Sequence, residues 1–258
     1  MGKTIKKNDI WSIFMYLIIY SIAGFFIETI FAIITKGVIE SRKSFIYGPF
    51  CAIYGIGAVA MIIFLKNEKK VWKLFVFGAI IGATVEYLMS FFCEKIFGVK
   101  WWDYSNCFLN IQGRTCIGYA FAWGLLAIFL IRFINPYMDK IINNLKNKKN
   151  IFKVATSVFI MLFLFDALIT NYALDCFYCR VAIENNLNIE NKEDIAEKYT
   201  KIKNDKRLAG FINQYFSNEK MLKLYPNLMI QEKENKLVYI DTLVPDAKSF
   251  YFRLGGIF

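Results

Sequence analysis

Three acidic residues lie inside long apolar stretches of the chain. Glu28, Glu86 and Asp166 are each surrounded in sequence by aliphatic and aromatic residues. An ionisable side chain inside a membrane-spanning segment costs free energy, so it is a candidate for substrate binding or proton transfer. A carboxylate in such surroundings either takes up a proton or lies beside a cation. The first question is therefore which cations the chain brings to these acids.

Two polar connections between apolar stretches carry cations that could reach the acids. Residues 36–47 contain Arg42 and Lys43, and residues 94–115 contain Arg114. The first connection follows the first of five apolar stretches and the second follows the third. Since the first and third stretches cross a bilayer in the same direction, both connections fall on the same side. The three acids lie in the first, third and fifth stretches, which run in the same direction. Each is roughly 22–26 Å from the start of its stretch at about 1.5 Å per residue, so the three share one depth. The sequence predicts one polar cluster in the outer third of the membrane.

Two interpretations of this cluster remain open. In the first, the acids and cations hold a polar substrate or a proton. In the second, pairs such as Glu28 with Lys43 and Glu86 with Arg114 only join helices to one another. Trp102 is similarly ambiguous, because a Trp at the end of a span belongs either to an interfacial aromatic belt or to the wall of a site.

Five apolar stretches are long enough to cross a bilayer, which takes about 20 residues. They are residues 11–34, 47–65, 71–92, 116–134 and 151–174. The second stretch opens on Gly48 and Pro49, so we expect its first turns to be irregular or partly re-entrant. The sequence predicts an all-α, polytopic membrane bundle over residues 1–183, with about five transmembrane helices.

The distribution of Lys and Arg predicts how the bundle is oriented. Twelve Lys and Arg residues lie in the N-terminal segment and in the connections on the same side of the membrane, and six lie in the connections on the other side. Cytoplasmic connections carry the excess of positive charge, so we expect a cytoplasmic N-terminus. With five spans the C-terminal tail then lies outside, and one span more or fewer would invert its side.

The last part of the chain, residues 184–258, is polar and differs from the bundle. Asp205 precedes apolar residues at helical spacing over residues 208–216. This pattern predicts an N-capped amphipathic helix that lies on the membrane or on the bundle. Residues 228–231 and 237–240, separated by a polar segment, predict a small hairpin.

Composition excludes several classes of function. The 258 residues are 57% hydrophobic and carry a net charge of +11 without any His, so a Ser/His/Asp triad and a His-ligated metal are excluded. Gly2, Lys3 and Thr4 lack the upstream glycine of a P-loop. We expect no cofactor and no metal, and an enzyme is disfavoured. The basic residues adjoin apolar stretches, so they indicate anionic lipid rather than nucleic acid.

Three segments carry a resemblance to a known family. They are FIYGPFCAIYGIGA at residues 45–58, GATVEYLMSFFCEKIFGVKWWDYS at residues 82–105, and NIQGRTCIGYAFAWGLLAIFLIRFINP at residues 110–136. These segments resemble the bacterial ABC-transporter type IV family, also described as CmpB-type ABC transporter permeases. The resemblance covers roughly residues 10 to 175, which include Asp166.

The resemblance implies a set of site residues. The matching positions are Glu28, Tyr47, Gly48, Pro49, Tyr54, Gly55, Glu86, Tyr87, Trp102, Asp103, Tyr104, Asn110, Gly113 and Arg114. The chain departs from the family twice. It has Arg42, Lys43, Ser44 in place of Asn-Arg-Gly, so the cation there is expected at Lys43. It has Ala52 in place of the usual Pro, which leaves the start of the second span less rigid.

The resemblance also implies a function and partners. We expect a multi-pass protein of a bacterial cell membrane that acts as a permease or transporter subunit, with the lipid bilayer and a separate ABC ATPase as partners. Residues 137–150 form the one cytoplasmic connection long enough to hold a helix that couples to an ATPase. Two alternatives remain: a membrane enzyme or assembly factor that recognises lipid or envelope head groups, and a structural bundle whose ion pairs only hold helices together.

Overall fold

The computed structural model describes residues 10–147, 149–233, 236–245 and 252–253, so the N-terminal lysines used above to predict orientation lie outside it. The chain forms two compact units. Unit 1 comprises residues 1–26, 48–88 and 104–165, and unit 2 comprises residues 27–47, 89–103 and 166–258. Three of the five boundaries between the units fall inside long helices, and the other two, after residues 47 and 103, fall in non-helical connections.

Four helical segments of the described chain are long and apolar enough to cross a membrane. They are α1 (Ile10–Lys36), α3 (Val71–Phe97), the continuous segment Ile117–Lys146, and α6 (Lys149–Glu184). In the most apolar 18-residue part of each segment, only 17–28% of the residues are buried. Most of these side chains therefore point outward, as expected of helices that face lipid. The protein is an all-α polytopic membrane protein, as predicted.

The second predicted stretch is shorter than the sequence suggested. Helix α2 (Ala52–Leu65) has 14 residues, about 21 Å at 1.5 Å per residue, which is less than a hydrocarbon core of about 30 Å. The residues just before it are not helical, because Pro49 disfavours helical geometry at Gly48. The irregular start is therefore confirmed, but α2 is not long enough to count as a fifth full-length span.

Glycines end two of the long helices. Gly37 follows α1 with φ +64° and Gly98 follows α3 with φ +68°. The N–H of Gly37 donates to the carbonyl of Ile33 at 3.0 Å, and the N–H of Gly98 donates to that of Glu94 at 2.9 Å. A left-handed residue after the last turn is favourable for glycine because it has no Cβ.

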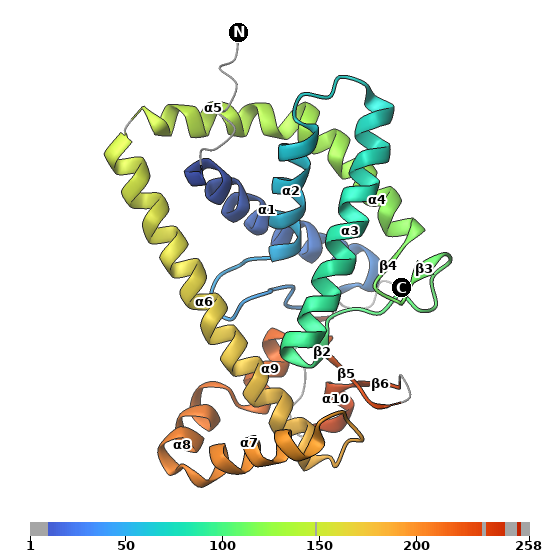
Figure 1. The fold of residues 1–258 in the computed structure, drawn as a ribbon, viewed down its shortest axis with the longest axis vertical. Helices are drawn as coiled ribbons and strands as arrows, with labels where there is room; N and C mark the ends of the chain where they lie inside the picture. Colours follow the sequence, from blue (N-terminus) through green and yellow to red (C-terminus); the bar gives the residue numbers. More distant parts are fainter. Residues whose placement is uncertain (1–9, 148, 234–235, 246–251, 254–258) are drawn as a thin grey trace. The chain divides into compact units, whose positions relative to one another are not determined.

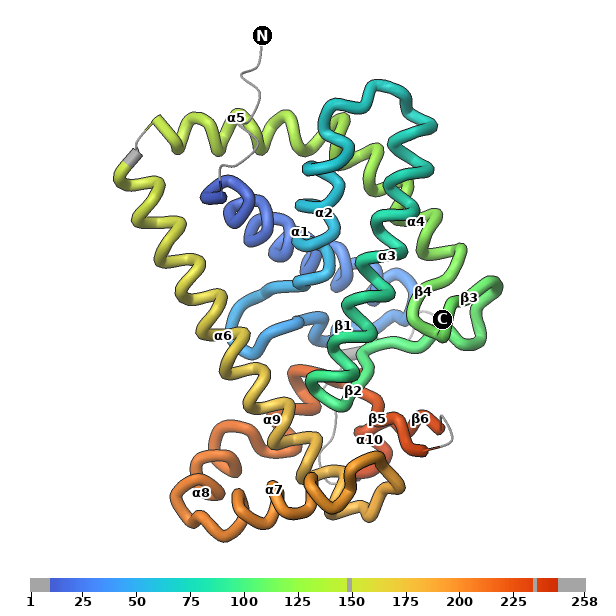
Figure 2. The backbone as a smooth tube through the Cα atoms, in the orientation of Figure 1, coloured from blue at the N-terminus to red at the C-terminus, as the bar shows by residue number. Residues whose placement is uncertain are grey.

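The segment Ile117–Lys146 changes direction at a π-helix. It consists of α4 (Ile117–Phe129), η1 (Leu130–Ile134) and α5 (Asn135–Lys146). Pro136 has no N–H and its ring would clash with the carbonyl four residues earlier, so an α-helix cannot continue unchanged through it. The wider turn relieves this conflict, and the N–H of Asn135 donates to the carbonyl of Leu130. Figure 2 traces α4 into α5, which runs across the direction of α2 and α3.

Unit 1 has its own apolar core. It is built around Tyr16 of α1, Met61 of α2, Leu74 of α3, Trp123 of α4 and Ile142 of α5. One hairpin, of β3 (Asn110–Ile111) and β4 (Thr115–Cys116), belongs to this unit.

Unit 2 contains most of the polar tail. Its helices are α7 (Lys192–Asn204), α8 (Lys206–Tyr215), α9 (Asn218–Leu224) and α10 (Ile240–Leu243). Strands β2 (Val99–Lys100), β5 (Met229–Gln231) and β6 (Leu237–Tyr239) form an antiparallel sheet, and β1 (Val38–Ile39) pairs with β7 (Phe252–Arg253). Figure 1 labels these four helices and strands β2, β5 and β6, and Figure 2 labels β1.

Two local predictions for the tail are confirmed. The carboxylate of Asp205 accepts hydrogen bonds from the N–H groups of Arg207 and Leu208, which caps α8 as the sequence indicated. The predicted hairpin forms between β5 and β6, with Ile230 opposite Val238. The core of the unit is apolar and includes Ile230 together with residues of α6, α8 and α9.

Close packing of glycine against an aromatic ring gives a stability prediction. A Cβ at Gly82 of α3 would overlap the Trp123 side chain, whereas one at Gly210 of α8 would meet nothing within 4 Å. We expect Gly82→Ala to lower the free energy of unfolding by about 1–3 kcal/mol, because the core is overpacked. Gly210→Ala is the matched control and should stabilise by up to about 1 kcal/mol. Thermal unfolding in detergent measures both, and equal melting temperatures would contradict this packing.

Candidate functional site

The carboxylate of Glu86 is the best-enclosed charged group of unit 1. Glu86 lies on α3 and is only 4% exposed. Its Oε2 accepts a hydrogen bond from the hydroxyl of Thr115 at 2.7 Å, and its Oε1 accepts one from the hydroxyl of Tyr104 at 3.2 Å. A buried carboxylate needs such donors, because leaving it without them would cost several kcal/mol. The two hydroxyls come from the connection between α3 and α4.

Asparagine and glycine shape this connection. The side-chain amide of Asn110 donates to the carbonyls of Ser105 and Cys107, both at 3.0 Å, and its oxygen accepts from the N–H of Gly113 at 3.0 Å. Gly113 has φ +66°, which favours glycine. Its carbonyl accepts from the N–H of Tyr104 at 2.8 Å. These bonds hold Tyr104 where its hydroxyl reaches Glu86.

Aromatic rings and one arginine are associated with the residues beside Glu86 and its two donors. Tyr104 stacks on Tyr119 with ring centroids 4.3 Å apart. The guanidinium of Arg114 lies 5.9 Å from the centre of the Tyr87 ring, within the range of a cation–π contact. The Tyr87 hydroxyl donates to Gln112 at 2.6 Å. We define the Glu86 cluster as the residues Glu86, Tyr87, Tyr104, Arg114 and Thr115.

The Glu86 cluster offers a carboxylate, hydroxyls and a guanidinium in an apolar helix bundle. Such groups can bind a polar solute or exchange a proton. Within the described residues, no group of three His, Cys, Asp or Glu side chains could hold a metal ion. All six cysteines are free thiols.

A second buried acid, Asp166, fixes a loop in unit 2. Asp166 lies on α6 and is 3% exposed. Its Oδ1 accepts from the N–H of Tyr47 at 3.1 Å and from the hydroxyl of Thr170 at 3.4 Å. The hydroxyl of Thr170 accepts in turn from the N–H of Ile46 at 3.0 Å. Asp166 and Thr170, one helical turn apart, therefore anchor the backbone that leads into the second apolar stretch.

Arg42 pairs with an acid that sequence analysis did not single out. Glu40 is 8% exposed, and its carboxylate lies 2.5 Å from Arg42 and 3.2 Å from Lys36. In the sequence, the spacing of four residues between Lys36 and Glu40 is the feature that could have indicated this acid as an ion-pair partner. Lys43, expected beside Glu28, donates to the carbonyl of Tyr47 at 3.3 Å. Arg42 and Lys43 therefore both contribute to holding this loop.

Tyr225 of the tail also contacts this loop. Its side chain is 2% exposed, and its hydroxyl donates to the carbonyl of Ser44 at 3.5 Å. Burial raises the pKa of Tyr225, because the charged form of the hydroxyl would lose its solvation there. Trp101 stands edge-on to the Tyr225 ring at 6.3 Å and packs against the unit 2 core.

The residues predicted as one site fall in both units. Unit 1 contains Gly48, Pro49, Tyr54, Glu86, Tyr87, Tyr104, Asn110 and Arg114, and unit 2 contains Glu28, Arg42, Lys43, Tyr47, Trp102, Asp103 and Asp166. The structure brings Glu86 together with Tyr104, and Asp166 together with Tyr47. Tyr54 packs against Trp123 in the unit 1 core, with ring centroids 5.3 Å apart. The single cluster of all three acids stays a prediction.

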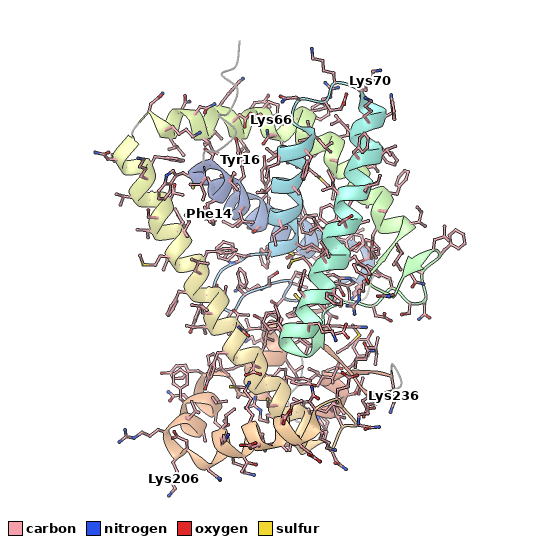
Figure 3. The ribbon with its side chains drawn as sticks, viewed as in Figure 1. Phe14, Tyr16, Lys66, Lys70, Lys206 and Lys236 are labelled. Carbon is pink, nitrogen blue, oxygen red and sulfur yellow. The ribbon has the colours of Figure 1, made fainter. Side chains whose placement is uncertain are left out.

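A third polar network, which sequence analysis missed, lies under α5. Asp139 accepts hydrogen bonds from the Tyr16 hydroxyl and from the amide of Asn135 at 3.4 Å, and pairs with Lys66 at 2.5 Å. The Tyr20 hydroxyl donates to Asn135 at 3.2 Å. Figure 3 labels Tyr16 and Lys66, on α1 and at the end of α2. We call these five residues the Asp139 network.

The Asp139 network was missed because Asp139 lies beyond the last apolar residue of its stretch, where a charge is unremarkable by hydropathy. The available signals were Tyr16 and Tyr20, one turn apart on the first apolar stretch, and Asn135 with Pro136 at the end of the fourth. Their pairing with Asp139 depends on the direction that α5 takes after the π-helix.

Comparison with known proteins identifies the family. The family described as Putative ABC-transporter type IV matches residues 15–171. The chain belongs to this family, and the predicted resemblance is confirmed. No curated protein and no solved structure matches the chain. The matched range contains Glu86, Asp166 and the Asp139 network, and it ends before the polar tail.

The hydrogen bond from Thr115 to Glu86 gives a testable prediction. Thr115→Val keeps the shape of the side chain but removes the hydroxyl donor, so it should lower the free energy of unfolding by about 1–3 kcal/mol. Thr115→Ser keeps the hydroxyl and serves as the control, with a smaller loss. Thermal unfolding of the purified variants measures the difference. Identical melting temperatures for the two variants would show that this bond does not stabilise the buried carboxylate.

Proposed function

We propose that the protein is the permease subunit of a bacterial membrane transporter that is driven by a separate ATPase. The observation that carries this proposal is the position of α5. This helix ends the segment Ile117–Lys146, runs across the direction of α2 and α3 (Figure 2), and is attached through Asp139 to Tyr16 of α1 and to Lys66 at the end of α2. A transverse helix fixed to several spanning helices can pass a displacement from a partner to the bundle.

The surface of α5 supports docking of a partner. Ile142 is 1% exposed and points into the unit 1 core. Tyr137, Ile141 and Leu145, spaced four residues apart, form a stripe that is 66%, 47% and 42% exposed. Exposed apolar side chains on one helix face are typical of helices that fit a groove in another protein. Membership of the family favours an ABC ATPase as that partner.

The Glu86 cluster supplies a place for a transported solute. Its carboxylate, hydroxyls and guanidinium lie in the same unit as α5, so movement of α5 can change the surroundings of Glu86 without crossing a unit boundary. The solute that suits these groups is small and polar, with donors for the carboxylate. Membership of the family supports transport in general and leaves the solute open.

A second candidate function is recognition of a lipid or envelope head group by the Glu86 cluster. The observation that favours it is Arg114, whose guanidinium lies over the Tyr87 ring beside Thr115. Arginine is well suited to phosphate because its planar donors match the phosphate oxygens. A phospholipid that co-purifies with the wild type but not with Arg114→Gln would favour this function over transport.

Partner docking on α5 can be tested by substitution. Ile141→Glu places a charge in the exposed stripe and should abolish co-purification with an ABC ATPase, because a charge without a partner is costly in an apolar interface. Asn143→Glu introduces the same charge at an exposed position outside the stripe and should leave co-purification intact. Affinity purification with mass spectrometry measures both. Equal recovery of a P-loop ATPase with both variants, or its absence from the wild type, would contradict the proposal.

The role of Glu86 can be tested in whole cells. Glu86→Gln removes the charge with little change in volume, so uptake of the transported solute should fall by tenfold or more, about 1.4 kcal/mol or more of lost interaction. Uptake is measured across a panel of polar solutes and normalised to folded protein in the membrane. If the residue only joins elements of unit 1, the variant will lower the melting temperature and leave normalised uptake unchanged.

A further inference from the structure

Helix α8 exposes two aromatic side chains beside two cations. Phe211 is 47% exposed and Tyr215 is 50% exposed, and their ring centroids lie 4.9 Å apart. Arg207 lies one turn before Phe211 and is exposed. The ammonium of Lys220 lies 5.8 Å from the centre of the Tyr215 ring. We call Arg207, Phe211, Tyr215 and Lys220 the α8 surface.

The rest of α8 is already used by unit 2. Ile212 and Phe216 are each 4% exposed and belong to the core of this unit. Sequence analysis left two alternatives for the amphipathic helix, packing on the bundle or on the membrane. Packing within unit 2 accounts for Ile212 and Phe216, and among the described residues it leaves Phe211 and Tyr215 about half exposed.

Contacts with α6 set the height of α8 relative to a bilayer. Phe177 shares the core with Ile212 and Phe216, and the guanidinium of Arg180 donates to the carbonyl of Phe216 at 2.7 Å. Phe177 and Arg180 lie three and six residues after Leu174, the last residue of the apolar stretch, which is about 4–9 Å along α6. Next to Leu174, Asp175 forms an ion pair with Lys198 at 2.5 Å, so polar surroundings begin there.

The about 4–9 Å by which these contacts follow the apolar stretch is close to the thickness of the head-group layer. The head-group layer extends roughly 5–8 Å beyond the hydrocarbon core on each side. Aromatic residues concentrate at this level because their rings prefer the boundary between lipid and water. Arginine and lysine beside them are attracted to lipid phosphates. Lys206, at the start of α8, also projects away from the ribbon in Figure 3.

From this combination we infer that the α8 surface binds the anionic lipid surface of the membrane in which the protein is embedded. Phe211 and Tyr215 insert at the boundary of the acyl chains, and Arg207 and Lys220 contact lipid phosphates. Because α6 holds unit 2 at the membrane, this contact needs little intrinsic affinity. The inference is independent of the proposed transport function.

Depth-dependent quenching of tryptophan fluorescence tests this inference. The full-length protein is placed in nanodiscs of phosphatidylcholine and phosphatidylglycerol that are brominated near the carbonyl end of their acyl chains. Phe211→Trp keeps an aromatic ring in the α8 surface. Asn213→Trp places the same ring at an exposed position on another face of α8 and is the matched control. The signal of the five native tryptophans, measured with the wild type, is subtracted from both.

We expect the bromolipids to quench the added tryptophan of Phe211→Trp at least about twofold more than that of Asn213→Trp, because only the former reaches the acyl chains. Adding Arg207→Glu and Lys220→Glu to Phe211→Trp should reduce this quenching in discs that contain phosphatidylglycerol. Equal quenching at positions 211 and 213 would overturn the inference. Quenching that the charge reversals leave unchanged would overturn the anionic lipid as the occupant. Strong protection of Phe211→Trp from bromolipids by a bound protein would assign the surface to that protein instead.

Discussion

The structure depends on one constraint: a charged or polar side chain inside an apolar helix bundle must find its hydrogen-bond partners within the chain. Glu86 is bonded by hydroxyls from the α3–α4 connection, and Asp166 by Thr170 and by the backbone before α2. Asp139 is bonded by groups of α1, α2 and its own helix. In each case the hydrogen bonds to the carboxylate also fix the position of a connection or a helix, which the sequence alone does not determine.

This constraint relates the polar groups to the proposed function. A carboxylate bonded to elements distant in sequence moves when those elements move, and its contacts change with them. In unit 1 this applies to both Asp139 and Glu86, which lie in one compact body with α5. Under the proposed function, a partner that displaces α5 acts on Glu86 through elements of a single unit. Long-range communication between the two units is not needed for this mechanism.

The sequence pointed to two carboxylates that are buried in the structure, but it did not indicate the groups that bond them. Glu86 and Asp166 were identified because a charge within a long apolar run is rare, and both are buried. Their partners were not identified, because hydropathy contains no information on which hydroxyl or N–H reaches a carboxylate. Arg42 illustrates this: its charge suited a membrane acid, but Glu40, two residues away, is the acid with which it pairs.

The sequence by itself determined the class of protein, the long apolar helices, the capped helix after Asp205 and the hairpin that follows it. These features depend on composition and on periodicity over neighbouring residues, which the chain carries locally. Only the tertiary structure decided that α2 is short, that α5 turns across the bundle and that Asp139 joins it to α1 and α2. These features arise where a proline, a π-helix and the partly buried carboxylate of Asp139 must be accommodated together, and their partners are far apart in sequence.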